Sequence, residues 1–144
     1  MTEDVLPPPR PEALAEEETT RKVIGAFYTV YNALGYGFLE AVYARALAVE
    51  LSARGIPFER EVSFEVRYRG QLVGLYRADF VVEGRVVVEL KAAVHVTKAD
   101  TRQLLNYLRA SGIDVGLLLN FGPEPTLRRV VKVPWRSGAE GEEG

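Results

Sequence analysis

The sequence contains no cysteine, which excludes disulfides, catalytic thiols and zinc sites of the cysteine type. It also lacks a long apolar run, because the longest, Val86–Val88 and residues 115–119, are too short to cross a bilayer. The first residues are acids and prolines, so no basic region followed by an apolar core marks a secretory signal. These absences predict a cytoplasmic protein that does not enter a membrane.

What is present suits one globular domain with charged ends. The 144 residues are 47% hydrophobic and 26% charged, close to the average of globular proteins. Acids gather in residues 1–20 and 137–144 and leave a basic body between them. That body is compatible with a polyanionic partner, although an arginine-rich composition alone explains it equally well. We predict a disordered Pro/Glu-rich segment over 1–15, a folded domain over 16–136 and a disordered acidic tail over 137–144.

Hydrophobic periodicity predicts eight elements in the order ααβββαββ. The helices are expected at residues 11–33, 39–54 and 98–110, and the strands at 58–69, 72–82, 85–92, 115–119 and 127–133. This order predicts a mixed α/β (α+β) domain in which helices flank a mixed central sheet.

Two segments carry more specific local signals. Thr97 is the expected N-cap of the third helix, with Asp100 three residues on to complete a capping box. Strand 58–69 alternates strictly, which predicts that Val62, Phe64, Val66 and Tyr68 share one face of a half-solvated strand. We interpret four aromatic residues as core positions: Tyr68, Tyr76, Phe80 and Phe121.

The residues that point to chemistry lie in a predicted hairpin. Asp79 precedes Glu89 by ten residues, and Lys91 follows Glu89 by two, so Glu89 and Lys91 share one strand face. These charges lie among valines and alanines that indicate an interior strand. Burying a charge there is costly unless it is paired or holds a metal. The alternative reading is a structural Glu–Lys pair beside an edge aspartate.

This set of residues suits the metal-assisted hydrolysis of a phosphodiester. Two carboxylates bind Mg²⁺ through oxygen, and this hard cation keeps some of its waters. The metal polarises the phosphoryl oxygen and lowers the pKa of a bound water. The ammonium of Lys91 positions or activates that water and offsets charge in the transition state.

The turn between the two strands supplies a geometric condition for this site. With a two-residue turn at Glu83 and Gly84, Asp79 would lie opposite Val88, and the two carboxylates would occupy opposite sheet faces. We therefore predict a three-residue loop over 83–85, which pairs Asp79 with Glu89, or a bulge beside Asp79.

The hairpin and its neighbours resemble a known superfamily. An Asp-x9-Glu-x-Lys pattern, preceded by a helix and followed by a helix and a strand, is similar to the PD-(D/E)XK nucleases, although Ala78 replaces the proline before Asp79. More narrowly, the chain resembles the GxxExxY protein family over about residues 20–133. The motifs that carry this resemblance are Gly37–Tyr43, Tyr76–Asp79, Val88–Ala92, Gln103–Leu108 and Asn120–Gly122.

The resemblance implies a restriction-endonuclease-like core and a role for several residues. Asp79 and Glu89 would bind Mg²⁺ or Mn²⁺ together with the Leu90 carbonyl, and Lys91 would be the catalytic lysine. Glu40 resembles an additional acidic ligand that many members contribute, although an acid in a first helical turn also suits the helix dipole. In one branch of the superfamily, residues like Gln103 and Tyr107 support the lysine and contact substrate; here they could also be surface decoration.

Four residues are candidates for binding substrate. Tyr43 shares a helix face with Glu40, which fits either a bond toward the site or a core tyrosine with a satisfied hydroxyl. Arg77 and Lys98 are candidates for phosphate contacts, against the alternative of a solvated charge. Tyr107 is the fourth, on the ground of the resemblance.

Two functions follow from this reading. The first is a Mg²⁺-dependent nuclease that hydrolyses DNA or RNA through Asp79, Glu89 and Lys91, assisted by Glu40 and Gln103. The second is a nucleic-acid-binding or assembly protein that keeps the fold without turnover. A third reading is a plain α/β domain with a structural ion pair. The small body leaves specificity to a partner or to a homodimer.

Overall fold

The computed structural model describes residues 11–132 of the chain, with side chains from residue 16 onward. Residues 1–10 and 133–144, which include most of the predicted segment 1–15 and the whole predicted tail 137–144, lie outside the described residues. Within the described range no helix is both long enough and apolar enough to cross a membrane.

The described chain forms three helices and five strands in the predicted order ααβββαββ. The helices are α1 (Pro11–Leu34), α2 (Glu40–Ala53) and α3 (Lys98–Ser111), and the strands are β1 (Phe58–Tyr68), β2 (Gln71–Val82), β3 (Val86–Lys91), β4 (Val115–Phe121) and β5 (Pro125–Val131). No helix or strand begins or ends more than two residues from its predicted boundary, which is the usual uncertainty of an element boundary.

The five strands form one mixed sheet in the order β1-β2-β3-β4-β5. Strands β3 and β4 are parallel, and the other neighbours are antiparallel. Helix α3 is the crossover between β3 and β4, as a parallel pair requires. Every residue of β4 is buried, because this central strand is covered on both faces.

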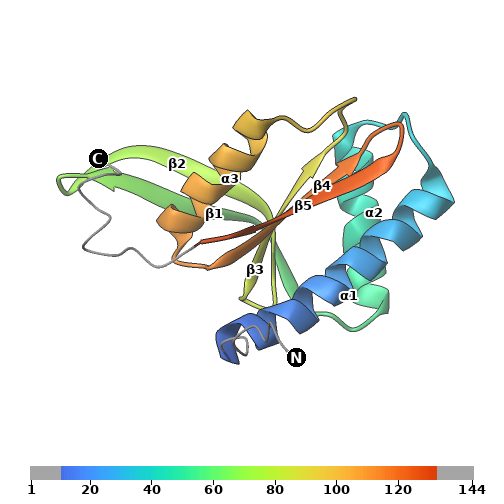
Figure 1. The fold of residues 1–144 in the computed structure, drawn as a ribbon, viewed down its shortest axis with the longest axis horizontal. Helices are drawn as coiled ribbons and strands as arrows, with labels where there is room; N and C mark the ends of the chain where they lie inside the picture. The colour runs from blue at the N-terminus through green and yellow to red at the C-terminus, as the bar shows by residue number, and fades with distance from the viewer. Residues whose placement is uncertain (1–10, 133–144) are drawn as a thin grey trace, which may run out of the picture.

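Helices cover the sheet on both sides, so the protein has three layers (Figure 1). Helices α1 and α2 pack on one face in a cluster that includes Phe27, Leu47 and Phe121. Helix α3 packs on the other face through Leu104 and Leu108. This arrangement confirms the predicted fold class of a mixed sheet flanked by helices.

Local signals place the start of α3 where the sequence predicted it. The Thr97 hydroxyl accepts the Asp100 N–H, and the Asp100 carboxylate accepts the Thr97 N–H, which completes the capping box. Such a cap stabilises a helix by about 1 kcal/mol. Gly112 ends the helix with a φ of 76°, a left-handed conformation that glycine adopts without steric cost.

The prediction for the far half of β1 was wrong in one respect. Val62 and Phe64 are partly buried against the cluster below α3, but Tyr68 is 66% exposed and Val66 is exposed as well. The reason is that the β1–β2 hairpin extends past the end of the helical layers, so none of the described helices covers its tip (Figure 1). Tyr68 is therefore no core residue, whereas Phe80 and Phe121 are fully buried as predicted.

A buried asparagine joins the sheet to the loop after β3. Asn120 on β4 is 1% exposed and lies beside Lys91 in the parallel register. Its Oδ1 accepts the Ala93 N–H and its Nδ2 donates to the Ala93 carbonyl, both at 3.0 Å. Gly122 makes room for this bridge, since a Cβ there would lie 2.4 Å from the Ala93 oxygen.

Replacing Asn120 by alanine should destabilise the protein by about 2–4 kcal/mol, because the Ala93 amide and carbonyl both lose a buried partner. Urea unfolding of the two proteins measures the difference. Asn106→Ala on the exposed surface of α3 is the matched control and should change the free energy of unfolding by less than about 0.5 kcal/mol. Equal losses in the two variants would contradict a structural role for Asn120.

Candidate active site

The loop between β2 and β3 meets the geometric condition that the sequence set. Val82 pairs with Val86, and the Arg85 N–H donates to the Val82 carbonyl at 2.9 Å, so the loop has the three residues 83–85. Glu83 and Gly84 both have positive φ, at 55° and 65°. The backbone ladder of this register ends at Phe80 and Val88, one residue short of Asp79 and Glu89 on their respective strands.

The strand β2 also changes its phase at Asp79. Phe80 packs in the cluster under α1 and α2, whereas Tyr76 and Ala78 pack in the cluster under α3, although strict alternation would place all three on one face. On β1 the residue across from Asp79 is Glu61, which has a φ of 53° and no ladder partner. Both strands are thus irregular beside Asp79, as a bulge would make them.

Beyond Phe80 and Val88 the carboxylates replace the ladder between β2 and β3. The Asp79 N–H donates to Glu89 Oε2 at 3.2 Å, and the Leu90 N–H donates to Asp79 Oδ2 at 2.8 Å. Each acid is therefore held by a backbone amide of the opposite strand. Among the described residues, no amide and no hydroxyl group donates to Asp79 Oδ1 or Glu89 Oε1, and the two carboxyl groups interact with each other through a side-chain hydrogen bond.

The two acids are partly buried and repel each other. Burial, followed by repulsion from Asp79, raises the pKa of Glu89 to about 7. Burial also raises the pKa of Asp79, although the Leu90 N–H, a hydrogen bond with the Glu89 carboxyl group and the ammonium of Lys91 act in the opposite direction. A pair of carboxylates that resists ionisation in this way favours a bound cation.

Lys91 lies beside the acids but is paired elsewhere. Its Nζ is 3.7 Å from Oδ1 of Asp100, the carboxylate that also caps α3. Its positive charge still acts on both acids and lowers the pKa of Asp79 and of Glu89. From the sequence, Asp100 was predicted only to complete the capping box of α3. Nothing in the local sequence indicated that the residue at the third position of α3 reaches back to the end of β3.

Glu40, an exposed residue at the first position of α2, interacts electrostatically with this group but does not form a three-acid metal cluster with Asp79 and Glu89. Its pKa is raised by burial and then by repulsion from Asp79, with Lys91 acting in the opposite direction. The loop before α2 holds Glu40 in place, and Tyr43 holds that loop: the Tyr43 hydroxyl donates to the Gly35 carbonyl and accepts the Phe38 N–H. Tyr43 is fully buried, so the structure favours the core-tyrosine reading over a bond toward substrate.

Tyr76 is the site residue that sequence reasoning missed. Its hydroxyl donates to Glu89 Oε2, and its ring is stacked on Tyr107 of α3 with centroids 3.4 Å apart. We interpreted Tyr76 as a core aromatic, and it is 6% exposed. Its hydroxyl was not predicted to reach Glu89, because regular alternation over 76–79 gives no hint of the phase change at Asp79.

The other predicted residues lie outside this centre. Gln103 is exposed on α3 and makes no hydrogen bond to Lys91 among the described residues. It lines a groove of about 480 Å³ with Lys98, Ala99, Arg102 and Asn106. Arg77 is 67% exposed and lies 3.8 Å from Glu61, so it is a solvated charge beside an acid and not part of the carboxylate group.

The residues present fit a divalent cation that keeps several waters. In the described part of the chain no three Asp, Glu or His side chains come close enough to form an all-protein cage. Mg²⁺ does not need one, since it is commonly held by one or two carboxylates. The oxygens of Asp79 and Glu89 that accept from no amide or hydroxyl of the described residues supply that number, with Glu40 nearby.

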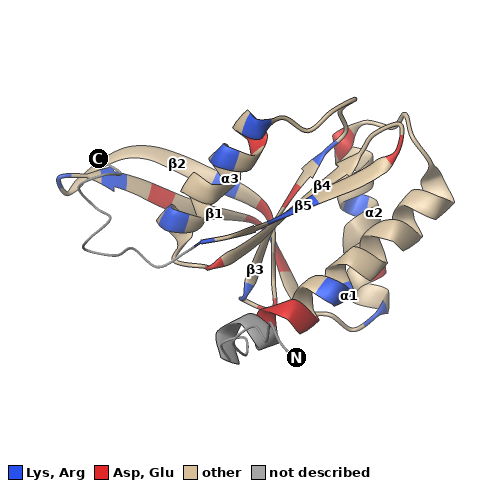
Figure 2. Ribbon diagram, in the orientation of Figure 1, with Lys and Arg blue, Asp and Glu red and all other residues tan. Residues whose placement is uncertain are grey.

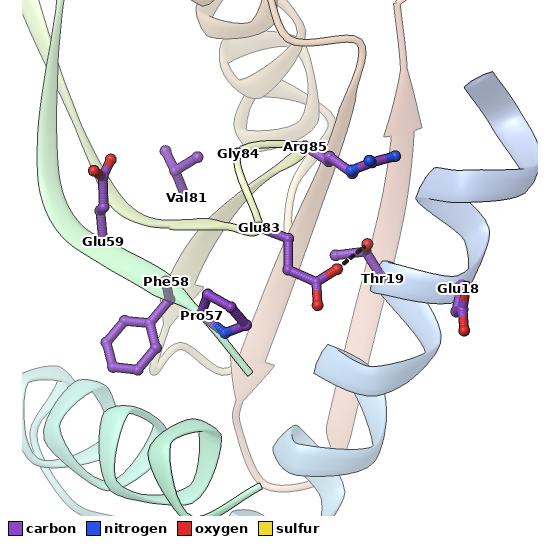
Figure 3. Close-up of a pocket in the computed structure, with 9 residues that line it drawn as sticks. All are labelled: Glu18, Thr19, Pro57, Phe58, Glu59, Val81, Glu83, Gly84 and Arg85. Atoms are coloured by element: carbon purple, nitrogen blue, oxygen red, sulfur yellow. Dashed lines mark hydrogen bonds between the residues drawn. The ribbon is translucent and has the colours of Figure 1, made fainter. Parts of the chain in front are cut away.

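A deeper hollow lies at the other end of the hairpin and lacks this chemistry. A pocket of about 720 Å³ is formed where α1 approaches the start of β1 and the β2–β3 loop (Figure 3). Three acids line it, Glu18, Glu59 and Glu83, but they form no metal-binding cluster among the described residues. Glu83 accepts hydrogen bonds from Thr19 at 2.6 Å and Lys22 at 3.0 Å, so its charge is already paired. The candidate active site is therefore the Asp79–Glu89–Lys91 group.

Comparisons with known proteins agree with this fold. The crystal structure of SSO0001 is similar to this chain with a TM-score of 0.51 and 20% sequence identity, over 89% of this chain and 64% of that chain. At this identity the likeness shows the fold alone, and this chain spans less than two thirds of the length of its neighbour. No curated protein matches the chain. A family profile matches residues 17–132, and through it the chain belongs to the PD-(D/E)XK nuclease superfamily.

Proposed function

We propose that this protein is a Mg²⁺-dependent nuclease that hydrolyses phosphodiester bonds of DNA or RNA. The observation that carries the proposal is the pair Asp79 and Glu89, cross-linked by backbone amides so that one oxygen of each is left over, beside Lys91. Membership in the superfamily supports the reaction type. Mn²⁺ would serve in place of Mg²⁺, because it takes the same oxygen ligands.

In this reaction the acids would bind the metal ion and Lys91 would act on the water and the phosphate. Asp79 and Glu89 would hold the ion, with Glu40 and the Leu90 carbonyl as further ligands. When bound, the ion polarises the phosphoryl oxygen and lowers the pKa of water. The Lys91 ammonium orients the attacking water and stabilises the negative charge that develops on the phosphate. For this it must exchange its contact with Asp100 for one with the substrate.

The nucleic acid would run along α3. Basic residues occur along this helix (Figure 2), and the groove there combines Lys98 and Arg102 with the amides of Gln103 and Asn106. The same helix begins next to Lys91 through Asp100. A strand bound in this groove is therefore led to the carboxylates. Gln103 would contact the substrate and would not support the lysine.

We also propose that the chain is a GxxExxY protein within the superfamily. The motif runs from Gly37 to Tyr43, and each named residue has a physical task here. Gly37 adopts a φ of 122°, Glu40 begins α2 beside Asp79, and Tyr43 ties down the loop between them. Tyr43 therefore acts on Glu40 and does not contact substrate.

A second candidate function is nucleic-acid binding without turnover. The contact between Lys91 and Asp100 favours it, because an engaged lysine is not free to assist a water. A domain that has lost catalysis would keep the basic surface of α3. The cytoplasmic location and the homodimer stay predictions from the sequence.

The pKa of Glu89 predicts how pH acts on the metal-free protein. Between its ordinary pKa of 4.5 and the folded value of about 7, the folded chain holds a proton that the unfolded chain has released. The free energy of unfolding should therefore fall as the pH rises through this window, by up to about 3 kcal/mol.

Glu89→Gln should remove this fall and raise the melting temperature at about pH 8 by several degrees, with little change at about pH 4. Thermal melts in EDTA across this range measure both effects. The matched control is Glu59→Gln, an exposed acid of β1, which should leave the pH profile unchanged. If the melting temperature of the wild type stays constant between pH 4.5 and 7, the raised pKa of Glu89 is contradicted.

Lys91→Ala should reduce the cleavage rate by about 100-fold or more and leave the fold intact, because it removes charge stabilisation from the transition state. Labelled single- and double-stranded DNA and RNA, incubated with Mg²⁺ or Mn²⁺, provide the measurement. Lys132→Ala is the control, since that lysine pairs with Asp114 at the end of β5. If the wild type binds these probes but cleaves none of them, the second candidate function is correct.

Replacing Lys98 and Arg102 together by alanine should weaken the binding of nucleic acid to a similar extent for every base sequence. Each phosphate contact contributes about 0.9 to the slope of log K against log salt concentration for duplex DNA, so the double alanine variant should lose about two units of slope. Fluorescence anisotropy in EDTA at several salt concentrations gives the slope. Arg85→Ala, at the opposite end of the hairpin, should leave the slope unchanged.

A further inference from the structure

The hydroxyl of Tyr76 controls one of the two oxygens of Glu89. It donates to Oε2, the atom that also accepts the Asp79 N–H. With two donors on this oxygen, the plane of the carboxylate is fixed and Oε1 is the oxygen left for a ligand. A glutamate has three rotatable bonds and would otherwise sample several orientations.

Tyr76 is itself held rigidly from both sides. Its ring is stacked on Tyr107 with an interplanar angle of 12°, and on Phe64 of β1 at a centroid distance of 6.2 Å and an angle of 20°. The side chain is buried, so water does not compete strongly for its hydroxyl. Glu89 is thus connected through Tyr76 to α3, a helix that also contacts Lys91 through Asp100.

We propose that Tyr76 is a positioning residue for Glu89, and that α3 supports it there through Tyr107. This inference rests on the proposed function, in which Glu89 holds a divalent cation. It gives Tyr107 a task other than substrate contact, because its ring faces Tyr76 in the structure. Groups that orient a metal ligand in this way typically change metal affinity 10- to 100-fold, roughly, when they are removed.

The test is Tyr76→Phe, which deletes the hydroxyl and keeps the stacked ring. Mn²⁺ is titrated into the full 144-residue chain, and free Mn²⁺ is measured by electron paramagnetic resonance. The dissociation constant should rise about 10-fold or more. Tyr68→Phe on the exposed tip of β1 is the matched control and should bind Mn²⁺ as the wild type does.

Two further measurements keep the inference falsifiable. Tyr107→Leu removes the stacking partner and leaves both the Tyr76 hydroxyl and Glu89 in the chain; it should raise the dissociation constant in the same direction by a smaller factor. In cleavage assays Tyr76→Phe should raise the Mg²⁺ concentration for half-maximal rate and leave the KM for nucleic acid unchanged.

The outcomes separate the two proposals. Wild-type affinity for Mn²⁺ in Tyr76→Phe, with or without a lower melting temperature, would overturn the positioning role and leave the nuclease proposal standing. A wild-type chain that binds no Mn²⁺ would overturn both. A raised dissociation constant in Tyr76→Phe, with an unchanged one in Tyr68→Phe, supports the positioning role.

Discussion

The site depends on the point where β2 and β3 stop pairing through their backbones and begin to pair through carboxylates. Up to Phe80 and Val88 the two strands form an ordinary ladder. At the next position the amides of Asp79 and Leu90 donate to side-chain oxygens of the opposite strand. This exchange satisfies the amides, fixes one oxygen of each acid and leaves the other oxygen without an amide or hydroxyl donor among the described residues. The three-residue loop over 83–85 sets the register that leads to this exchange, because a two-residue turn without a bulge would place the acids on opposite faces.

Both helical layers contribute to this point of the sheet. Helix α2 brings Glu40, on a loop that Tyr43 ties down from the core. Helix α3 contacts Lys91 through its capping carboxylate Asp100, and it supports Tyr76 with a stacked ring. Because the same contacts dock α3 and orient charged groups, the stability of this helix and the geometry of the site are linked. A change at the α3 surface is then felt at the carboxylates.

The sequence was sufficient for features that obey local rules. Periodicity located all eight elements, and the Thr97 cap followed from residue types. Requiring Asp79 and Glu89 to meet predicted either a three-residue loop or a bulge beside Asp79, and the loop over 83–85 is present. The sequence was insufficient where tertiary contacts determine the position of a side chain. The phase change beside Asp79 could not be seen in a regular alternation, so the contact between Tyr76 and Glu89 was missed. Tyr68 was misplaced because alternation gives the face of a strand and not how far the helices reach over it.

A comparison of two neighbouring polar groups separates structure from function. Asn120 and the acids of β2 and β3 all lie among buried apolar residues of the sheet. Both ends of the Asn120 amide are bonded to Ala93, and this neutral group has no charge that a cation would offset. Asp79 and Glu89 each have one oxygen bonded to an amide of the opposite strand and one oxygen that accepts from no amide or hydroxyl of the described residues. Burial, and then repulsion from Asp79, raises the pKa of Glu89 to about 7. A neutral amide such as glutamine would be more stable at that position without a cation. In the proposed function, a bound cation would offset the repulsion between the two acids and would stabilise the same carboxylates that the metal-free fold holds at a cost.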